Sequence, residues 1–442
     1  MASLLLSNSN RPTIDTSIDQ ASLVYFKVHL KRFIILFSSL VLFACEQSQE
    51  VAHPNQMVAS KSIANDTVIE PQYGYDSQFH YPQFSGKYQV ASMEVTLTDH
   101  SRVETLSSTQ ESNNLSEPRR FNLRFYYPSA QVGLQNSEIK PNFNLDLSEK
   151  LPVISETAWA NLIGPQIRNG KMLRFSNYRN AFWNIKLNQK VSEDNSDFPI
   201  VIFSHGYGYS PEAYSALSAE LASHGYIVAS LNHTFGANPT ELVKKKNQIK
   251  WAKKLPTENM GEYLPIWSDD QIFVIEELNK LNSDDTSPFY QRLNLSQLGV
   301  FGHSYGGAAA YLTAARDPRV KAFMNLDGTL FQAGNFDVYQ PFAYLLSKNH
   351  LPFIQTSKLN SDAFLIKLKQ FEHASFTDHI LWWQWDFDNE NLGLGDVNGV
   401  QAVEQTSYLV RSFFDAYLLH NNQSWDSLTQ ENTPSRSSKK VN

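Results

Sequence analysis

Two stretches in the first third of the chain alternate hydrophobic and polar residues. Residues 88–97 and 120–128 both place apolar side chains at about every second position. This pattern is typical of a strand that buries one of its faces. A polar segment rich in Ser, Thr and Asn separates the two stretches, and we interpret it as a loose connection. The pattern therefore predicts two antiparallel strands at the start of a sheet.

Further along the chain, short continuous hydrophobic runs replace this alternation. Such runs indicate strands that are buried on both faces. They lie at residues 198–203, 226–231, 298–301, 320–326 and 351–356. Helical periodicity lies between and after them, at residues 211–222 (with Ser210 as a candidate cap), 269–281 and 403–419. Strands that alternate with helices predict a doubly wound α/β fold with a mostly parallel sheet.

One motif joins two of these elements. Gly302-His303-Ser304-Tyr305-Gly306 follows the buried strand at 298–301 and precedes a helix rich in small residues that begins near Gly307. A Ser between glycines on a sharp strand-to-helix turn is the nucleophile elbow of an α/β-hydrolase. We therefore predict that Ser304 is a nucleophile. We also predict an α/β-hydrolase fold, with antiparallel N-terminal strands and inserted loops.

The predicted nucleophile requires an acid further along the chain. A serine hydroxyl needs a base beside it, and the base needs a group that orients it. In this fold the order along the chain is Ser, then acid, then His. Asp327 follows the predicted strand at 320–326, and Gly328 after it allows a sharp exit from that strand. We predict that Asp327 is the acid.

The base should be a histidine on a loop after the last strand. His373 has this position, and His379 is the alternative. His350 precedes the last predicted strand and therefore comes too early. His205 and His303 neighbour the predicted site, and we interpret them as scaffold residues. The sequence therefore favours His373 as the base.

Two backbone N–H groups should stabilise the charge that develops on the reacting oxygen. One is expected from Tyr305, the residue after the nucleophile. The other is expected from the loop after the strand at 198–203. We assign it to Tyr207, with Gly206 as the neighbouring alternative.

These motifs together resemble those of a known family. The matching stretches lie at residues 203–208, 221–229, 302–307, 325–328 and 373–378. In content and order they resemble the platelet-activating factor acetylhydrolases of the plasma and intracellular type II kind, and the bacterial relatives of these enzymes. The resemblance extends over residues 85–420.

The resemblance implies a calcium-independent serine esterase. Its substrates would be esters with short or oxidised acyl chains, often on phospholipids. It implies Ser304, Asp327 and His373 as the catalytic triad, with Tyr207 and Tyr305 as oxyanion donors. Two alternatives stay open: a general short-chain carboxylesterase or lipase, and a surface lipoprotein that uses the fold only for binding.

Composition limits the partners of the chain. Its 442 residues are 42% hydrophobic and 13% aromatic, which is sufficient for a large core. A formal net charge of −7 argues against nucleic acid as a main partner, because phosphate binding needs a concentrated basic surface. The sequence has neither an H-E-x-x-H motif nor a cysteine cluster. We expect no metal and no other cofactor.

The single cysteine, Cys45, follows an apolar segment. Lys31 and Arg32 precede the apolar run 33–44, which is shorter than the roughly 20 residues of a membrane-spanning helix. A positively charged region, an apolar run and a small residue directly before the cysteine are typical of a secretory signal. Leu42-Phe43-Ala44-Cys45 resembles a bacterial lipoprotein box, in which the cysteine is lipidated. The sequence therefore predicts a lipid-anchored protein of the bacterial envelope, facing the periplasm or the outer membrane.

The pattern divides the chain into four parts. We expect a leader and signal peptide at residues 1–44 and a polar, flexible tether at residues 45–72. One catalytic domain is expected at residues 73–420, followed by a disordered tail at residues 421–442.

Overall fold

The computed structural model of the chain describes residues 82–105, 118–130, 185–237, 260–352, 354–381 and 394–430, with four short strands between them at 167–168, 171–172, 240–245 and 248–252. All of these residues belong to the unit Tyr73–Asn442. The predicted leader and tether, Cys45 and residues 431–442 lie outside the described residues. The predicted domain bounds therefore stay predictions.

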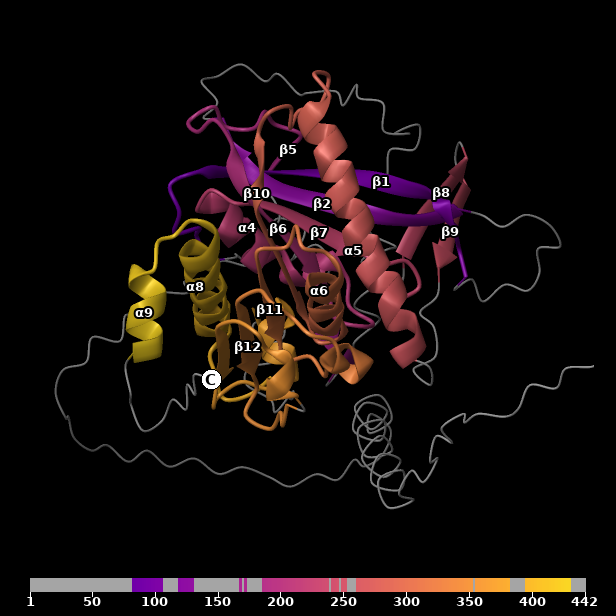
Figure 1. The fold of residues 1–442 in the computed structure, drawn as a ribbon. Helices are drawn as coiled ribbons and strands as arrows, with labels where there is room; N and C mark the ends of the chain where they lie inside the picture. The colour runs from indigo at the N-terminus through magenta and orange to yellow at the C-terminus, as the bar shows by residue number, and fades with distance from the viewer. Residues whose placement is uncertain are drawn as a thin grey trace, which may run out of the picture. The chain divides into compact units, whose positions relative to one another are not determined.

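A nine-stranded sheet lies at the centre of the described structure, in the order β13-β12-β11-β10-β6-β7-β2-β1-β5 (Figure 1). Neighbouring strands from β13 to β7 are parallel, whereas β2 pairs antiparallel with both β7 and β1. The strands are β1 Gln89–Val103, β2 Pro118–Ser129, β5 Lys186–Leu187, β6 Phe198–Ser204, β7 Ile227–Asn232, β10 Leu293–His303, β11 Ala322–Leu326, β12 Phe342–Leu346 and β13 Ala363–Lys367. The prediction of antiparallel first strands is confirmed.

Helices follow or connect most of these strands. The α-helices are α4 Ser215–Ser223, α5 Met260–Ser283, α6 Tyr305–Arg316, α8 Gly399–Leu418 and α9 Gln423–Gln430. The short 3-10 helices are η2 Pro211–Tyr214, η4 Phe331–Asn335, η5 Thr356–Lys358 and η6 His373–Phe376. Two small hairpins lie apart from the main sheet: β3 Ile167–Arg168 with β4 Lys171–Met172, and β8 Thr240–Lys245 with β9 Gln248–Ala252. None of the described helices combines the length and the apolar character that a membrane crossing requires.

Strand β6 shows how both faces of the sheet are covered. All of its residues are buried. Ile200 and Ile202 belong to one apolar cluster, which includes side chains of α5 and α6. Val201 and Phe203 belong to a second cluster, with side chains of α4 and α8. Because successive side chains of a strand point to opposite faces, helices must cover both faces of this sheet. The predicted doubly wound arrangement is confirmed.

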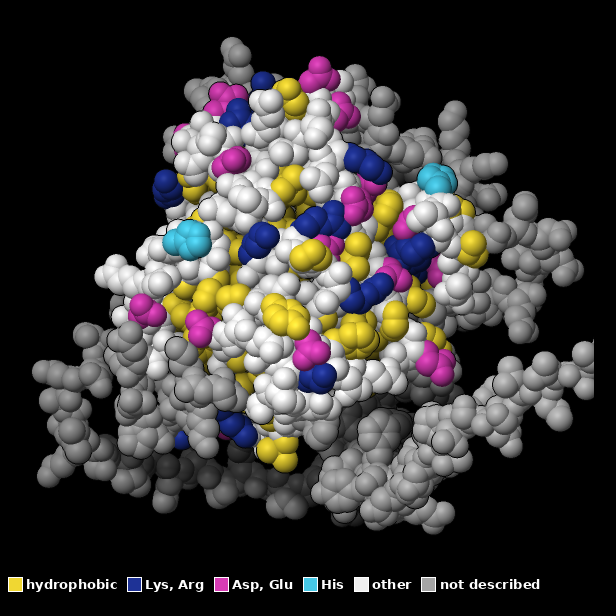
Figure 2. Space-filling model, viewed as in Figure 1, with side chains coloured by type: hydrophobic (Ala, Val, Ile, Leu, Met, Phe, Trp, Pro, Cys, Tyr) yellow, Lys and Arg dark blue, Asp and Glu magenta, His cyan; other side chains and the backbone are white. Residues whose placement is uncertain are grey.

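The surface of this unit mixes polar and apolar side chains. On the face shown in Figure 2, Lys and Arg side chains are interspersed with Asp and Glu, and hydrophobic side chains appear between them. Apolar groups on the surface are usual for a folded domain.

The predicted strand at residues 351–356 is wrong. Leu351 is 84% exposed, and Pro352 after it has no N–H to donate to a strand ladder. The sheet instead continues from β11 to β12 and β13, both parallel to it. The sequence signal of β12 is a run of five apolar residues, and that of β13 is a run of four followed by Lys367, both similar to the stretch at 351–356.

The predicted helix at residues 211–222 is divided. The short helix η2 comes first, and α4 follows it. The Ser210 side chain makes no capping hydrogen bond to η2, contrary to the prediction. Asp378 instead accepts a hydrogen bond at 3.0 Å from the N–H of Ala216, in the first turn of α4.

Residues 423–430 form helix α9, in a part of the chain where the sequence predicts a tail. Trp425 is 2% exposed. Its ring lies 5.2 Å from that of Phe364 in β13 and 5.2 Å from that of Phe413 in α8. One buried indole therefore attaches α9 to the sheet and to α8.

Three histidines are fully buried at the carboxyl ends of the central strands. His205 follows β6, His233 follows β7, and His303 ends β10. Burial lowers the pKa of all three, that of His205 to about 3, with a further contribution from the neighbouring His233. These imidazoles are therefore neutral in the folded protein near neutral pH.

We expect Trp425→Ala to lower the free energy of unfolding by about 3–5 kcal/mol, because it leaves a cavity between three elements. The matched control is Leu419→Ala, which removes a side chain that is 38% exposed. We expect the control to cost no more than about 0.5 kcal/mol. Urea unfolding followed by circular dichroism measures both, and equal losses would show that α9 does not stabilise the domain.

We expect the free energy of unfolding to decrease as the pH falls from 7 to 5. In the unfolded chain the buried histidines recover a pKa of about 6.5, so the unfolded state binds more protons below that pH. The stability that these histidines contribute is complete above this pH. Below it, each buried histidine lowers the free energy of unfolding by up to about 1.4 kcal/mol per pH unit. Urea titrations at both pH values test this, and an unchanged midpoint would contradict it.

Candidate active site

Ser304 occupies a strained turn between β10 and α6. Its backbone φ of 54° and ψ of −121° lie in a region that residues other than glycine rarely adopt. The turn is tight, because a Cβ on Gly302 would lie 2.3 Å from the carbonyl carbon of Gly306. The N–H of Ser304 donates to the carbonyl oxygen of Leu326 in β11, at 2.8 Å. The sequence thus places the serine hydroxyl at the carboxyl end of β10, on a tight turn that has no room for a side chain at Gly302.

Asp327 leaves the neighbouring strand at the same edge. It directly follows β11, also with a positive φ of 56°, and is 2% exposed. The side chain of Asn325 closes the turn by accepting from the N–H of Gly328 at 2.8 Å and donating to its carbonyl at 2.9 Å. The predicted sharp exit at Gly328 is confirmed.

His373 joins the two groups. It is the first residue of η6. Its Nε2 lies 2.9 Å from Oγ of Ser304, and its Nδ1 lies 2.7 Å from Oδ2 of Asp327. Since the carboxylate accepts from Nδ1–H, Nε2 accepts from the serine hydroxyl. The structure therefore brings together the three side chains that the sequence identified, in the geometry of an activated nucleophile.

The segment that carries His373 is fixed at both of its ends. Before the helix, Glu372 and Ser375 form a reciprocal capping box. After it, Asp378 accepts from Ala216, and its own N–H donates to the carbonyl oxygen of Ala213 at 2.7 Å. These bonds attach the histidine loop to the start of α4.

The second carboxylate oxygen of Asp327 also has partners. Oδ1 accepts from the N–H of Ser347 at 2.6 Å and lies 3.2 Å from Nδ1 of His350. Burial alone would raise the pKa of Asp327, but hydrogen bonds from His350 and His373 lower it below its usual value. The carboxylate is therefore charged near neutral pH. Sequence reasoning placed His350 before a strand that does not form, and so missed this contact.

The other histidines near the site have different contacts. His303 donates from Nε2 to the carbonyl oxygen of His373 at 3.0 Å and accepts at Nδ1 from the hydroxyl of Tyr214 at 2.8 Å. Burial and the neighbouring His373 lower its pKa well below the usual value. The ring of His379 packs 5.2 Å from that of Tyr209. Among the histidines that the sequence left as candidates for the base, His373 contacts Ser304.

The two predicted oxyanion donors lie close to Ser304 and to each other, with ring centroids 5.7 Å apart. Tyr305 is the first residue of α6, so its N–H has no acceptor within the helix. The N–H of Gly206 donates to the Tyr214 hydroxyl at 3.0 Å, which argues against Gly206 as the second donor. A Cβ on Gly206 would lie 3.2 Å from Cβ of Ser304, so the loop that carries Tyr207 adjoins the serine.

Among the residues that the structure describes, no group of three or more His, Cys, Asp or Glu side chains could hold a metal ion.

Comparisons with curated proteins identify relatives with one recurring activity in their names. Platelet-activating factor acetylhydrolase of Cavia porcellus is 26% identical over 292 residues, 58% of this chain and 63% of the relative. The Bos taurus protein of the same name is 28% identical, over 56% of this chain and 57% of the relative. A probable 1-alkyl-2-acetylglycerophosphocholine esterase of Arthroderma benhamiae is 26% identical, over 58% and 60%. The chain thus matches about three fifths of the length of these relatives.

A solved structure shares the fold. A ferulic acid esterase from Streptomyces cinnamoneus superposes with a TM-score of 0.58 at 22% identity, covering 78% of this chain and 94% of its own. At this identity the likeness concerns the fold alone, and it confirms the predicted α/β-hydrolase fold.

The family model for platelet-activating factor acetylhydrolase, isoform II, matches residues 73–262. This match and the curated relatives show that the chain is similar to the platelet-activating factor acetylhydrolase isoform II family over part of its length.

Proposed function

We propose that this protein is a serine esterase that hydrolyses carboxylic esters through an acyl-enzyme on Ser304. One observation carries the proposal: hydrogen bonds of 2.9 Å and 2.7 Å connect Ser304 through His373 to Asp327 without a break. The three groups come from the ends of β10 and β11 and from η6, so only the folded domain brings them together. The similarity to platelet-activating factor acetylhydrolases supports the same reaction class.

The geometry defines a role for each group. His373 takes the hydroxyl proton as Ser304 attacks the ester carbonyl, and Asp327 keeps the imidazole oriented and stabilises its charged form. The N–H groups of Tyr207 and Tyr305 bind the oxyanion. His373 then returns the proton to the leaving alcohol, and a water activated by the same imidazole releases the acid.

We propose that the substrates are phospholipid esters with short or oxidised acyl chains. The names of the relatives support this class, since two are platelet-activating factor acetylhydrolases and one is a probable 1-alkyl-2-acetylglycerophosphocholine esterase. A general short-chain carboxylesterase is the alternative that a substrate comparison tests.

We also propose that Cys45 is lipidated and holds the enzyme on the bacterial envelope. The support is the order of charged, apolar and small residues from Lys31 to Cys45. A lipid anchor would keep the enzyme at a membrane surface, where phospholipid esters are concentrated.

We expect a fluorophosphonate probe to label the folded wild type and not Ser304→Ala. Loss of the nucleophile should reduce ester turnover by at least about 10⁴-fold, by analogy with other serine hydrolases. The matched control is Ser412→Ala, another buried serine, in α8, which should keep both labelling and turnover.

The same proteins are assayed on p-nitrophenyl acetate, longer acyl esters and a short-acyl phospholipid. Turnover of the phospholipid, together with ester turnover that decreases as the acyl chain lengthens, supports the proposed substrate class. Turnover of simple esters alone favours a general carboxylesterase. A folded wild type that takes no label supports the binding protein and refutes the esterase.

We expect Cys45→Ser to abolish incorporation of an alkyne-tagged fatty acid when the full chain is expressed in bacteria. The physical reason is that the thiol is the only group in the predicted box that can take the lipid. Protein from the membrane fraction is compared after click labelling, with Ser304→Ala as a control that keeps the tag. Equal labelling of Cys45→Ser would contradict the proposal.

A further inference from the structure

The peptide that carries the Tyr207 N–H is held by its other end. The carbonyl oxygen of Gly206 accepts from Nδ1 of His205 at 2.7 Å and from the N–H of Tyr209 at 3.0 Å. This carbonyl and the Tyr207 N–H belong to one planar trans peptide and point in opposite directions. Groups that fix the carbonyl therefore also fix the direction of the N–H.

Contacts of His205 determine its protonation pattern. Its Nε2 accepts from the backbone N–H of His233 at 3.1 Å, so the proton of the neutral ring lies on Nδ1. Burial lowers the pKa of His205 to about 3, which keeps the ring neutral. A neutral ring with Nδ1–H is the form that can donate to Gly206.

The side chain of His233 continues this chain of contacts. Nδ1 lies 2.9 Å from Oδ2 of Asp270, and Nε2 lies 2.9 Å from Oγ of Ser204, the last residue of β6. Gln271 donates to the same Oγ at 2.6 Å. Ser204, His233 and Asp270 repeat the hydrogen-bond connectivity of the candidate triad, but all three are 0% exposed. No substrate reaches them, so a positioning role fits this second set.

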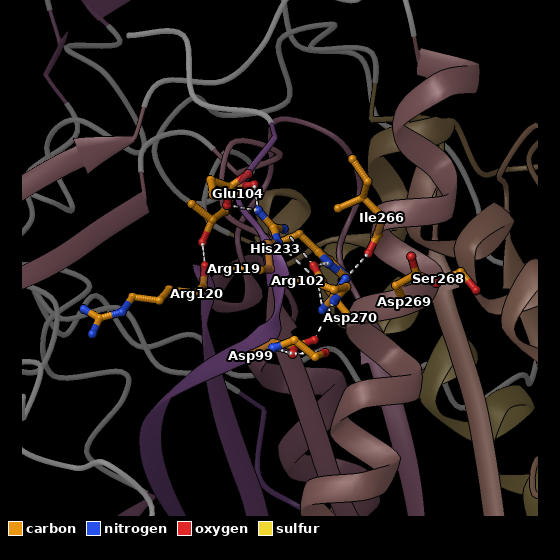
Figure 3. A network of polar contacts seen from close by, with 12 residues as sticks. Asp99, Arg102, Glu104, Arg119, Arg120, His233, Ile266, Ser268, Asp269 and Asp270 are labelled. Carbon is orange, nitrogen blue, oxygen red and sulfur yellow. Dashed lines mark hydrogen bonds and ion pairs between the residues drawn. The ribbon is translucent and has the colours of Figure 1, made fainter. Parts of the chain in front are cut away.

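Two arginines hold the buried carboxylate of this set, and Figure 3 shows both converging on Asp270 with His233 beside them. Arg119, 1% exposed, places Nη2 2.7 Å from Oδ2 and Nε 3.2 Å from Oδ1. Arg102 adds a contact of 2.9 Å to Oδ1. Burial alone would raise the pKa of Asp270, but the charge of Arg119 and the bond from His233 lower it. Asp270 is therefore a fixed anion.

Helix α5 connects this anion to the other side of the site. Trp267 lies one turn before Asp270, on the same side of the helix. Its ring stacks on His233 at 4.0 Å with an interplanar angle of 10° and lies 4.8 Å from the ring of Tyr305. It also contacts the ring of His205 at 4.9 Å. Because the Trp267 ring also lies 6.4 Å from that of Tyr207, the network packs against the side chains of both predicted oxyanion donors.

We propose that His205, His233 and Asp270 are positioning residues of the oxyanion hole. The ion pair of Arg119 and Asp270 holds the ring of His233. The ring and backbone of His233 hold β6 and His205, and His205 aims the Tyr207 N–H at the reacting oxygen. This inference rests on the proposed esterase function.

A structural role alone explains these contacts less well. Taking two charges out of water is costly, and apolar side chains of similar size often stabilise a core as well or better. An apolar replacement could not donate to Gly206 or fix a ring tautomer. The orientation of one peptide is therefore what the polar network adds to the packing.

The first test compares His205→Phe with His205→Asn. Phenylalanine fills the space and donates nothing, whereas the asparagine amide can replace Nδ1–H. We expect kcat of His205→Phe to fall by about 100-fold with KM within about threefold, as for loss of one oxyanion donor. His205→Asn should recover at least about tenfold of that loss. A folded His205→Phe with kcat within about threefold of the wild type would overturn the proposal.

The second readout is inhibition by a trifluoromethyl ketone, which forms a tetrahedral adduct on Ser304. Its Ki should rise by the same factor as kcat/KM falls, because both report binding of the oxyanion. Merely structural damage would change KM and Ki together. A Ki that stays at the wild-type value while kcat falls would also overturn the proposal.

The third variant, Asp270→Asn, decides the case if His205→Phe does not fold. We expect kcat to fall by about tenfold with a parallel rise in Ki. The matched control is Glu94→Gln, which weakens another partly buried ion pair, 2.8 Å from Arg124 on β2, and should keep kcat within about twofold. Equal losses of kcat in the two variants would refute a specific role of Asp270.

The controls separate this inference from the proposed function. Failure of the esterase proposal appears in the wild type, as absence of labelling and turnover. Failure of the positioning proposal appears only in the variants, against an active wild type.

Discussion

The pairing of β10 with β11 is the constraint on which the site depends. The two strands are parallel with His303 opposite Leu326, so the next residues, Ser304 and Asp327, leave the sheet at the same edge. Both residues have positive φ, and the Ser304 N–H is bonded back to β11. A slip of one residue in this register would send the serine and the carboxylate to opposite faces of the sheet. His373 can bridge them only because that register is fixed.

Local patterns were sufficient to predict much of the fold. Alternation identified β1 and β2, and continuous apolar runs identified β6, β7 and β11. They were insufficient after β11, because the run that begins at Leu351 resembles β12 and β13 in composition. Only burial distinguishes them: Leu351 is 84% exposed, whereas every residue of β12 is buried. Helix α9 was missed because its short polar sequence depends on a single buried indole, that of Trp425.

The site could be predicted where the chain order of the fold constrains it. Ser304, Asp327 and His373 follow the order of α/β-hydrolases, and the structure places them in contact. The second contact on Asp327, from His350, depends on where a loop turns and has no sequence signal. The same holds for Arg119 and Asp270, which lie 151 positions apart and meet only through the packing of α5 against the sheet.

Two Ser–His–Asp sets in one chain show that distances alone do not define a catalytic group. In both, the serine and the carboxylate lie within 2.9 Å of the imidazole nitrogens. The side chain of His373 is 28% exposed, whereas that of His233 is 0% exposed. A base must exchange its proton with a substrate, so only the exposed set can perform the chemistry. The buried set is free of that requirement and can serve orientation, because neutral rings with fixed tautomers transmit direction from one hydrogen bond to the next.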